Sequence, residues 1–184
     1  MVGPFFVAAG SGRAAARAVC LAAVLLLAAA SGAVAQDGPG PAFDTAAEGI
    51  GPLRLGMPAG EALTVAGCKA TLAAESYEGA TGDYVRQARL PGCGVTLKLA
   101  GERKGGAKDV AAVTVKAPSR FTTRQGIGIG ATEAQVLAAY GRFRDAEGIS
   151  RPGKVFVAGS LYDGLIFTFK NGRVAEIFLG AAAE

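Results

Sequence analysis

The segments IGPLRLGMPAGEALTVAG, residues 50–67, and IGIGATEAQVLAAYG, residues 127–141, decide the expected fold of this chain. Shifted by 74 positions, they align Gly56 with Gly130, Leu63 with Leu137 and Gly67 with Gly141. Each segment predicts a turn, then a short helix, then a glycine that ends it. The chain therefore contains a weak internal sequence repeat.

The later segment has the clearer helix signals. Thr132 and Gln135 have the T-x-x-Q spacing of a capping box, which satisfies free amides at a helix start. Val136, Leu137 and Tyr140 form an apolar stripe, and Gly141 predicts a left-handed end. In the earlier segment, Pro58 is expected at the first helical position and Gly67 at the end.

Alternating apolar residues predict strands after each helix. The expected strands cover residues 84–90, 95–99, 110–115, 165–169 and 174–179. Asn171-Gly172 between the last two predicts a tight hairpin. We therefore expect an α+β fold of two diverged repeats, each a short helix followed by an antiparallel β-meander, with both helices packed on a shared sheet.

The N-terminal residues 1–35 predict a cleavable signal peptide. Arg13 and Arg17 precede an apolar run over residues 18–30, and Ala33-Val34-Ala35 supplies a small-x-small cleavage site. An uncleaved membrane anchor is the alternative, because residues 18–35 carry no charge. Cleavage near Ala35 predicts a periplasmic or secreted protein. Residues 36–46 are then a flexible leader, residues 47–118 repeat 1 and residues 119–184 repeat 2 of one compact domain.

The remaining composition limits the possible partners. Without Arg13 and Arg17, 17 of the 19 basic residues remain against 15 acidic ones, a net charge of +2. Neither nucleic-acid binding nor a transmembrane segment after signal cleavage is expected. Cys68 and Cys93 predict a structural disulfide in an oxidising compartment, because their spacing is too wide for a redox-active pair.

The motif Leu55-Gly56-Met57-Pro58, with Glu61-Ala62-Leu63 and Gly67 after it, resembles the opening of a known repeat. It is similar to segments of the secreted β-lactamase inhibitory proteins and of the small lipoproteins of the outer-membrane β-barrel assembly machinery. The resemblance implies tandem units of a short helix and a β-meander. It implies no binding residue. Pro58 stands where those groups usually have a capping threonine, and the expected mature start has no cysteine for lipidation.

The chain contains no histidine, which excludes Ser-His-Asp and Cys-His triads and the commonest zinc ligand. Residues 126–131 fit G-x-G-x-x-A, but no βαβ pattern surrounds them, so we interpret them as turn glycines. Glu75 with Glu78, and Asp145 with Glu147, are carboxylate pairs by proximity alone. We expect no enzyme, no cofactor and no metal site.

The candidate binding residues are loop tyrosines and two basic groups. They are Tyr77, Tyr162, Arg103, Lys104, Lys108, Arg142 and Arg144. Tyrosine on a loop suits an interface anchor, and clustered cations suit an anionic surface. We therefore expect an exported, non-enzymatic module that binds an envelope or secreted protein. The alternatives are an inhibitor of an exported enzyme or a carboxylate-based polysaccharide hydrolase.

Overall fold

The computed structural model describes residues 42–182. Its helices are α1 (Ala59–Ala66) and α2 (Glu133–Tyr140), with short 3₁₀ turns η1 (Pro91–Cys93) and η2 (Gly141–Phe143). The strands are β1 (Thr71–Leu72), β2 (Ser76–Glu78), β3 (Asp83–Leu90), β4 (Val95–Gly101), β5 (Asp109–Lys116), β6 (Val155–Gly159), β7 (Gly164–Lys170) and β8 (Arg173–Gly180).

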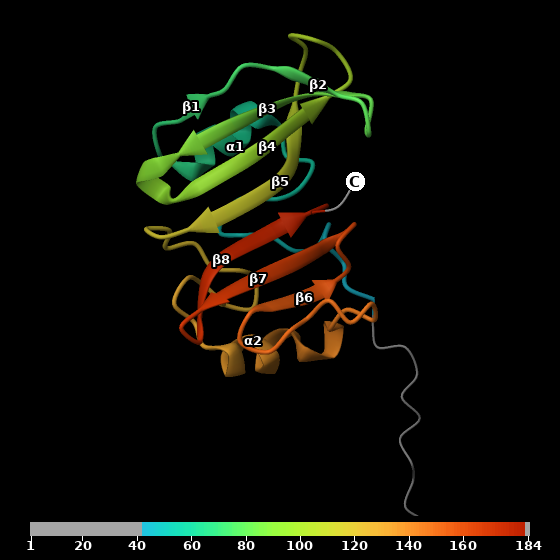
Figure 1. The fold of residues 1–184 in the computed structure, drawn as a ribbon. Coiled ribbons are helices and arrows are strands. Elements are labelled where there is room, and N and C mark those ends of the chain that lie inside the picture. The colour runs from blue at the N-terminus through green and yellow to red at the C-terminus, as the bar shows by residue number, and fades with distance from the viewer. Residues whose placement is uncertain (1–41, 183–184) are drawn as a thin grey trace, which may run out of the picture. The chain divides into compact units, whose positions relative to one another are not determined.

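All eight of these strands belong to one antiparallel sheet (Figure 1). The order is β1-β3-β4-β5-β8-β7-β6, and β2 also pairs with β3. β5 and β8, which are far apart in the sequence, pair at the centre from Ala112↔Gly180 to Lys116↔Glu176. This pairing makes the sheet continuous from one edge to the other.

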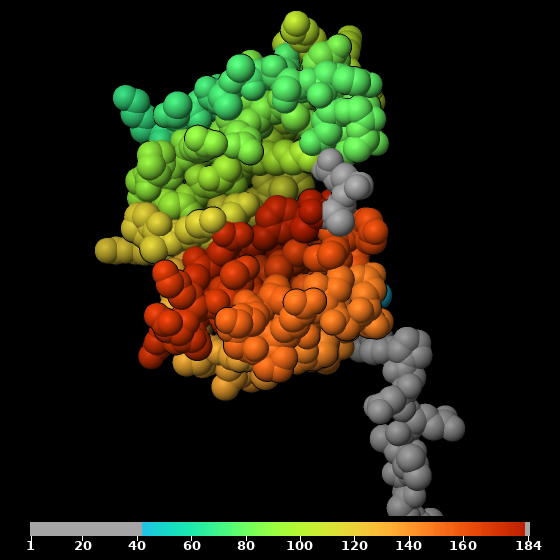
Figure 2. Space-filling model, viewed as in Figure 1, coloured from blue at the N-terminus to red at the C-terminus, as the bar shows by residue number. Residues whose placement is uncertain are grey.

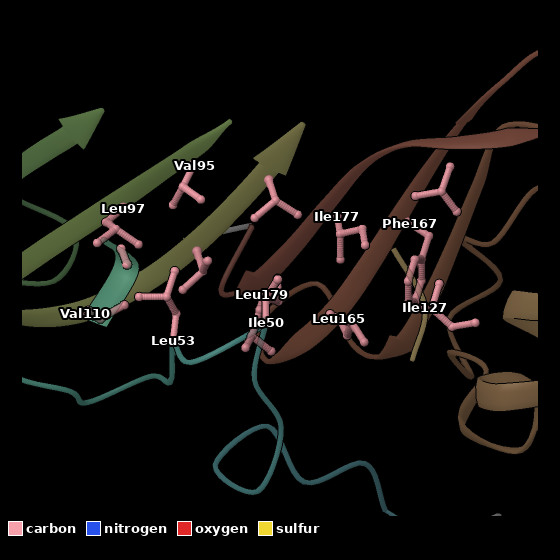
Figure 3. Packing of buried hydrophobic residues seen from close by; sticks show 14 of the residues in the cluster. Ile50, Leu53, Val95, Leu97, Val110, Ile127, Leu165, Phe167, Ile177 and Leu179 are labelled. Carbon is pink, nitrogen blue, oxygen red and sulfur yellow. The ribbon is translucent and has the colours of Figure 1, made fainter. Parts of the chain in front are cut away.

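One face of the sheet carries the hydrophobic core (Figure 3). Alternate residues of each strand point to this face, because side chains along a strand alternate between faces. On β4 these are Val95, Leu97 and Leu99, all nearly inaccessible to solvent. Ile50 and Leu53, from the segment before α1, pack into the same core.

The predicted architecture of two helix-plus-meander repeats packed on a shared sheet is wrong. The described chain is mostly one antiparallel sheet with only two eight-residue helices, and β1 and β2 have no counterpart among β6, β7 and β8. The sequence similarity between the two segments reflects a shared requirement for glycine in turns. Gly56 and Gly130 have φ angles of 72° and 89°, a conformation that favours glycine wherever such a turn occurs.

The helix ends agree with the sequence in part. The capping box at Thr132 and Gln135 is confirmed, and so is the left-handed end at Gly67. Pro58 stands one position before α1 and not within it. Gly141 is wrong as a left-handed end, because its backbone is right-handed and leads into η2. Leu137 is 37% exposed, so α2 buries only Val136 and Tyr140 from the expected stripe.

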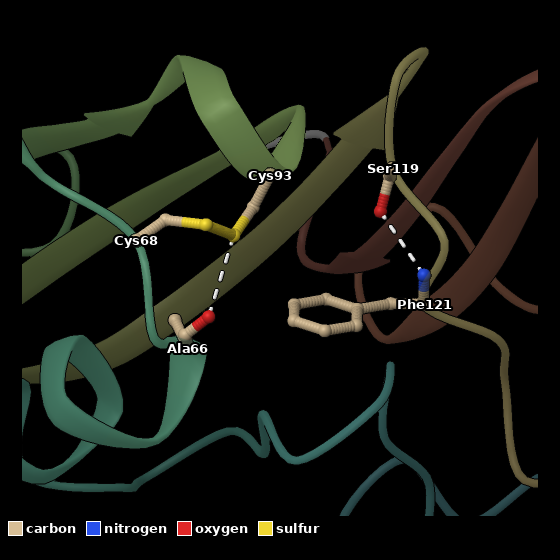
Figure 4. Close-up of a disulfide and its surroundings, with 5 residues drawn as sticks. All are labelled: Ala66, Cys68, Cys93, Ser119 and Phe121. Carbon is tan, nitrogen blue, oxygen red and sulfur yellow. Dashed lines mark hydrogen bonds between the residues drawn. A yellow bond between two sulfur atoms is a disulfide. The ribbon is translucent and has the colours of Figure 1, made fainter.

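The predicted disulfide between Cys68 and Cys93 is confirmed (Figure 4). Its Cα atoms are 6.1 Å apart, within the usual range for such a bond. The bond joins Cys68, the second residue after α1, to Cys93 in η1, which follows β3. A disulfide of this kind is typical of proteins in oxidising compartments.

The expected signal peptide, residues 1–35, lies outside the described residues. The last residues of the expected leader are described, and they pack against α2, η2 and the β6–β7 loop. The Phe43 ring contacts the rings of Tyr140 and Phe143, and the Thr45 hydroxyl donates to Asp163. Between residues 42 and 182, no helix has the length and apolar character needed to cross a membrane.

Candidate functional site

The face of the sheet opposite the core is not covered by α1 (Figure 1). In Figure 1 α1 lies behind the sheet, so the viewer sees this open face, and Figure 2 shows it with all its atoms. It carries the alternate residues of each strand, such as Thr96 and Lys98 on β4. We call this surface the open face.

A continuous row of side chains crosses the open face. Strand register places its members side by side, in the order Arg89, Thr96, Thr114, Phe178, Ile166 and Val157. Arg89 is exposed, Phe178 is half-buried and Val157 is fully buried. The row therefore changes from polar at β3 to apolar at β6.

A hollow of about 570 Å³ lies at the polar end of this row. Its floor includes Thr96 and Thr114, and its charged groups are Arg89, Lys116 and Glu176. Lys116 Nζ lies 2.5 Å from Glu176 Oε2, whereas the Arg89 guanidinium donates to the neutral amide oxygen of Gln87 at 3.2 Å. The hollow therefore has hydroxyl groups and one arginine available for a polar or anionic group.

The sheet topology brings Tyr77 and Tyr162 to the same end of the sheet. β3, β5 and β7 begin at this end, and β4, β6 and β8 finish there. Tyr77 lies on β2 and Tyr162 in the β6–β7 loop, separated by about five strand spacings or roughly 24 Å. They are 62% and 67% exposed, more than any other large apolar or aromatic side chain in the described residues. We call this end of the sheet the loop end.

The β4–β5 loop places the first basic group between these tyrosines. Arg103 and Lys104 are exposed. Lys108 is not available to a partner, since its side chain is only 8% exposed and its ammonium lies 2.6 Å from Glu75 Oε1. Lys108 also donates to the Arg103 carbonyl at 3.0 Å, so it supports the loop.

The second basic group lies beyond the β6 edge. Arg142 and Arg144 are exposed and lie over the rings of Phe143 and Phe156, at 4.6 and 5.0 Å from the ring centroids. Arg144 pairs with Ala158 of β6, about four strand spacings or roughly 19 Å across the sheet from β5. The two basic groups therefore do not form one patch.

The carboxylates that the sequence singled out do not converge. Glu75 pairs with Lys108, and Glu78 pairs with Lys98. Hydrogen bonds from Lys108 and from the Gly105 amide lower the pKa of Glu75. Burial alone would raise the pKa of Asp145, but hydrogen bonds from Ser150 and the Ile149 amide outweigh it and lower the pKa. Glu75 and Asp145 therefore each hold a loop in place through these hydrogen bonds.

A buried carboxylate that the sequence did not single out is Glu48. It accepts hydrogen bonds from the amides of Gly49 and Arg124, at 3.0 and 2.9 Å, and from the Tyr140 hydroxyl at 3.1 Å. Burial and the neighbouring Glu48 charge raise the pKa of Tyr140. With its acceptors satisfied, Glu48 ties the segment before α1 to α2 and to the turn at Arg124.

The described residues hold no cluster of histidine, cysteine, aspartate and glutamate suited to a metal ion. The 126–131 segment forms a bridge and turn ahead of α2, with Thr122 facing Gly128 and no βαβ unit around it. Gly126 and Gly130 have the positive φ angles of turn glycines, as expected, whereas Gly128 lies in the bridge.

Comparison of the chain with protein-family models, with curated proteins and with solved structures gives no match. The resemblance to β-lactamase inhibitory proteins and to the barrel-assembly lipoproteins therefore stays a prediction.

Sequence reasoning missed the open-face hollow. The alternation of β4 marks Thr96 and Lys98 as outward-facing. The sequence carries no signal that aligns Thr96 with Thr114 and then with Phe178, because that register depends on the central pairing of β5 with β8.

Proposed function

We propose that this chain is an exported, non-enzymatic binding module whose protein partner docks at the loop end of the sheet. One observation carries the proposal: the two most exposed large apolar or aromatic side chains of the described residues, Tyr77 and Tyr162, flank the exposed cations Arg103 and Lys104 at that end. Tyrosine and arginine are, with tryptophan, the residues most enriched at energetic centres of protein interfaces.

Charge favours a partner with acidic groups. Neither Arg103 nor Lys104 has a carboxylate within ion-pair distance among the described residues, whereas the neighbouring Lys108 is occupied by Glu75. A bound carboxylate would gain charge-assisted hydrogen bonds from these two side chains without breaking an internal ion pair. The predicted signal peptide and the disulfide support a partner in the cell envelope or outside the cell.

The test begins with affinity capture from envelope extract, using the chain with its disulfide intact and chemical crosslinking. The dissociation constant of any stoichiometric partner is then measured against variants. We expect the double variant Tyr77→Ala/Tyr162→Ala to bind at least tenfold more weakly, with the same melting temperature as the unchanged chain.

Leu137→Ala is the matched control. Leu137 is also an exposed apolar residue, but it lies on α2, which contributes none of the proposed docking residues, so its loss should leave affinity unchanged. Equal weakening by the control, or a fall in melting temperature that accounts for the tyrosine effect, contradicts the proposed docking surface.

A further inference from the structure

A second hollow, of about 480 Å³, lies beside α1 on the core side of β3. Its apolar lining comes from three elements: Leu63 of α1, Leu72 of β1 and Leu99 of β4. Leu72 is 46% exposed, although it is a large apolar side chain in a short edge strand. The volume lies within the usual range for small-molecule sites.

Arg86 lines this hollow from β3. It pairs in register with Leu99, which is 3% exposed, so its side chain leaves the sheet on the core side. Its Nε is buried and has no hydrogen-bond partner. An unsatisfied buried donor is unfavourable, and it is more so when the group is charged.

The nearby acidic groups leave Arg86 Nε without a hydrogen-bond partner, although the Arg86 charge lies close enough to Glu75 to lower the pKa of that carboxyl. Both carboxylate oxygens of Glu75 are occupied, Oε1 by Lys108 at 2.6 Å and Oε2 by the Gly105 amide at 2.8 Å. Asp109 also lines the hollow, but its register partner is Ala100, which places its side chain toward the open face. Glu75 thus lies near two cations, Lys108 and Arg86, and one carboxylate cannot balance both, so the three groups together carry one net positive charge.

We propose that this hollow binds a small amphipathic carboxylate. The carboxylate meets the guanidinium of Arg86, whose planar array of donors suits two parallel hydrogen bonds. The aliphatic part covers Leu63, Leu72 and Leu99. One uncompensated positive charge beside an apolar lining selects a single negative charge on an otherwise apolar molecule.

The experiment titrates octanoate into the full chain with its disulfide intact, and follows binding by amide chemical shifts and calorimetry. We expect saturable shifts at α1, β1 and the β4–β5 loop, and at least tenfold weaker binding of the neutral octan-1-ol. Arg86→Gln should weaken octanoate binding by tenfold or more, because it removes the charge.

Arg89→Gln is the matched control on the same strand. Arg89 lies three residues along β3, and therefore on the open face, so this variant keeps full octanoate affinity. Leu72→Asp provides a second test at a position that is 46% exposed, and it should abolish binding because it places a negative charge beside the ligand carboxylate.

Any one of four results overturns the proposal. The first is equal affinity of the unchanged chain and Arg86→Gln for octanoate. The second is an equal response to octanoate and octan-1-ol, and the third is retained binding in Leu72→Asp. Loss of binding in Arg89→Gln with shifts confined to the open face would place the carboxylate site in the other hollow and also refute it.

Discussion

The two helices have equal length but are stabilised by different interactions. α2 begins with a reciprocal capping box, in which the Thr132 hydroxyl accepts from the Gln135 amide and the Gln135 side chain accepts from the Thr132 amide. It ends at Tyr140, a fully buried aromatic residue. α1 has no side-chain cap at Pro58 and buries only Ala62 and Ala66.

α1 buries little of its surface, but a covalent bond next to it fixes its position. Cys68 follows the helix directly after Gly67 and is bonded to Cys93. The comparison shows two ways of fixing a short helix against a sheet, since a helix of eight residues is not stable alone. α2 depends on local capping and a large core side chain, and α1 depends on a tether.

The largest expected effect is at the core anchor of α2. The Tyr140 ring contacts Phe167 at 5.3 Å between centroids, and its hydroxyl donates to Glu48. Tyr140→Ala should lower the free energy of unfolding by about 3–5 kcal/mol, measured by urea denaturation. The matched change in α1, Ala66→Gly, should cost only about 1 kcal/mol.

A control separates packing from hydrogen bonding at the same position. Tyr140→Phe keeps the ring but removes one donor to the buried Glu48, and should cost about 1–3 kcal/mol. If Ala66→Gly proves as costly as Tyr140→Ala, the two helices do not differ in the way described.

The second effect is at the tether of α1. Replacing both Cys68 and Cys93 by alanine should lower the free energy of unfolding by about 3–4 kcal/mol, since the bond closes a loop between residues 25 apart. Amide hydrogen exchange should accelerate mainly in α1 and η1, and little in α2. Chemical reduction of the unchanged chain is the control, and uniform acceleration across the sheet would argue against a local tether.

The smallest effect is at the start of α2. Thr132→Ala removes the cap and should cost about 1 kcal/mol. Exchange of the Gln135 and Val136 amides should accelerate, while the amides of α1 keep their rates. Thr132→Ser retains the hydroxyl oxygen and should restore most of the lost stability; failure to do so would show that the methyl group matters more than the cap.

Much of the sheet could be predicted from local patterns. All five expected strands are present, and the Asn171-Gly172 hairpin is confirmed, with φ angles of 53° and 71°. β1 and β2 were not predicted because segments of two and three residues carry no periodicity, and only pairing with β3 defines them. β6 was not predicted because Val155–Gly159 is a short apolar run without alternation.

Prediction of the candidate site from local sequence patterns is limited in the same way. The exposure of Tyr77 and Tyr162 agrees with the surface positions that the sequence indicated, although Tyr77 lies on a strand rather than in a loop. Lys108 could not be distinguished from Arg103 and Lys104, since its burial depends on Glu75, more than 30 positions earlier. Nothing in the sequence around Arg86 marked it as a binding residue, because its surroundings are set by the β3–β4 register and by α1.

The pairing of β5 with β8 has a consequence for the order of folding. Among the described strands β8 comes latest in the sequence, and it lies in the middle of the sheet between β5 and β7. Ribosomal synthesis therefore delivers β3, β4 and β5 well before the strand that completes their neighbourhood. Until then, the free edge of β5 is open to pairing with other chains, and closure of so long a loop makes the final step slow. The newly made chain consequently depends on β8 for protection of this edge against aggregation.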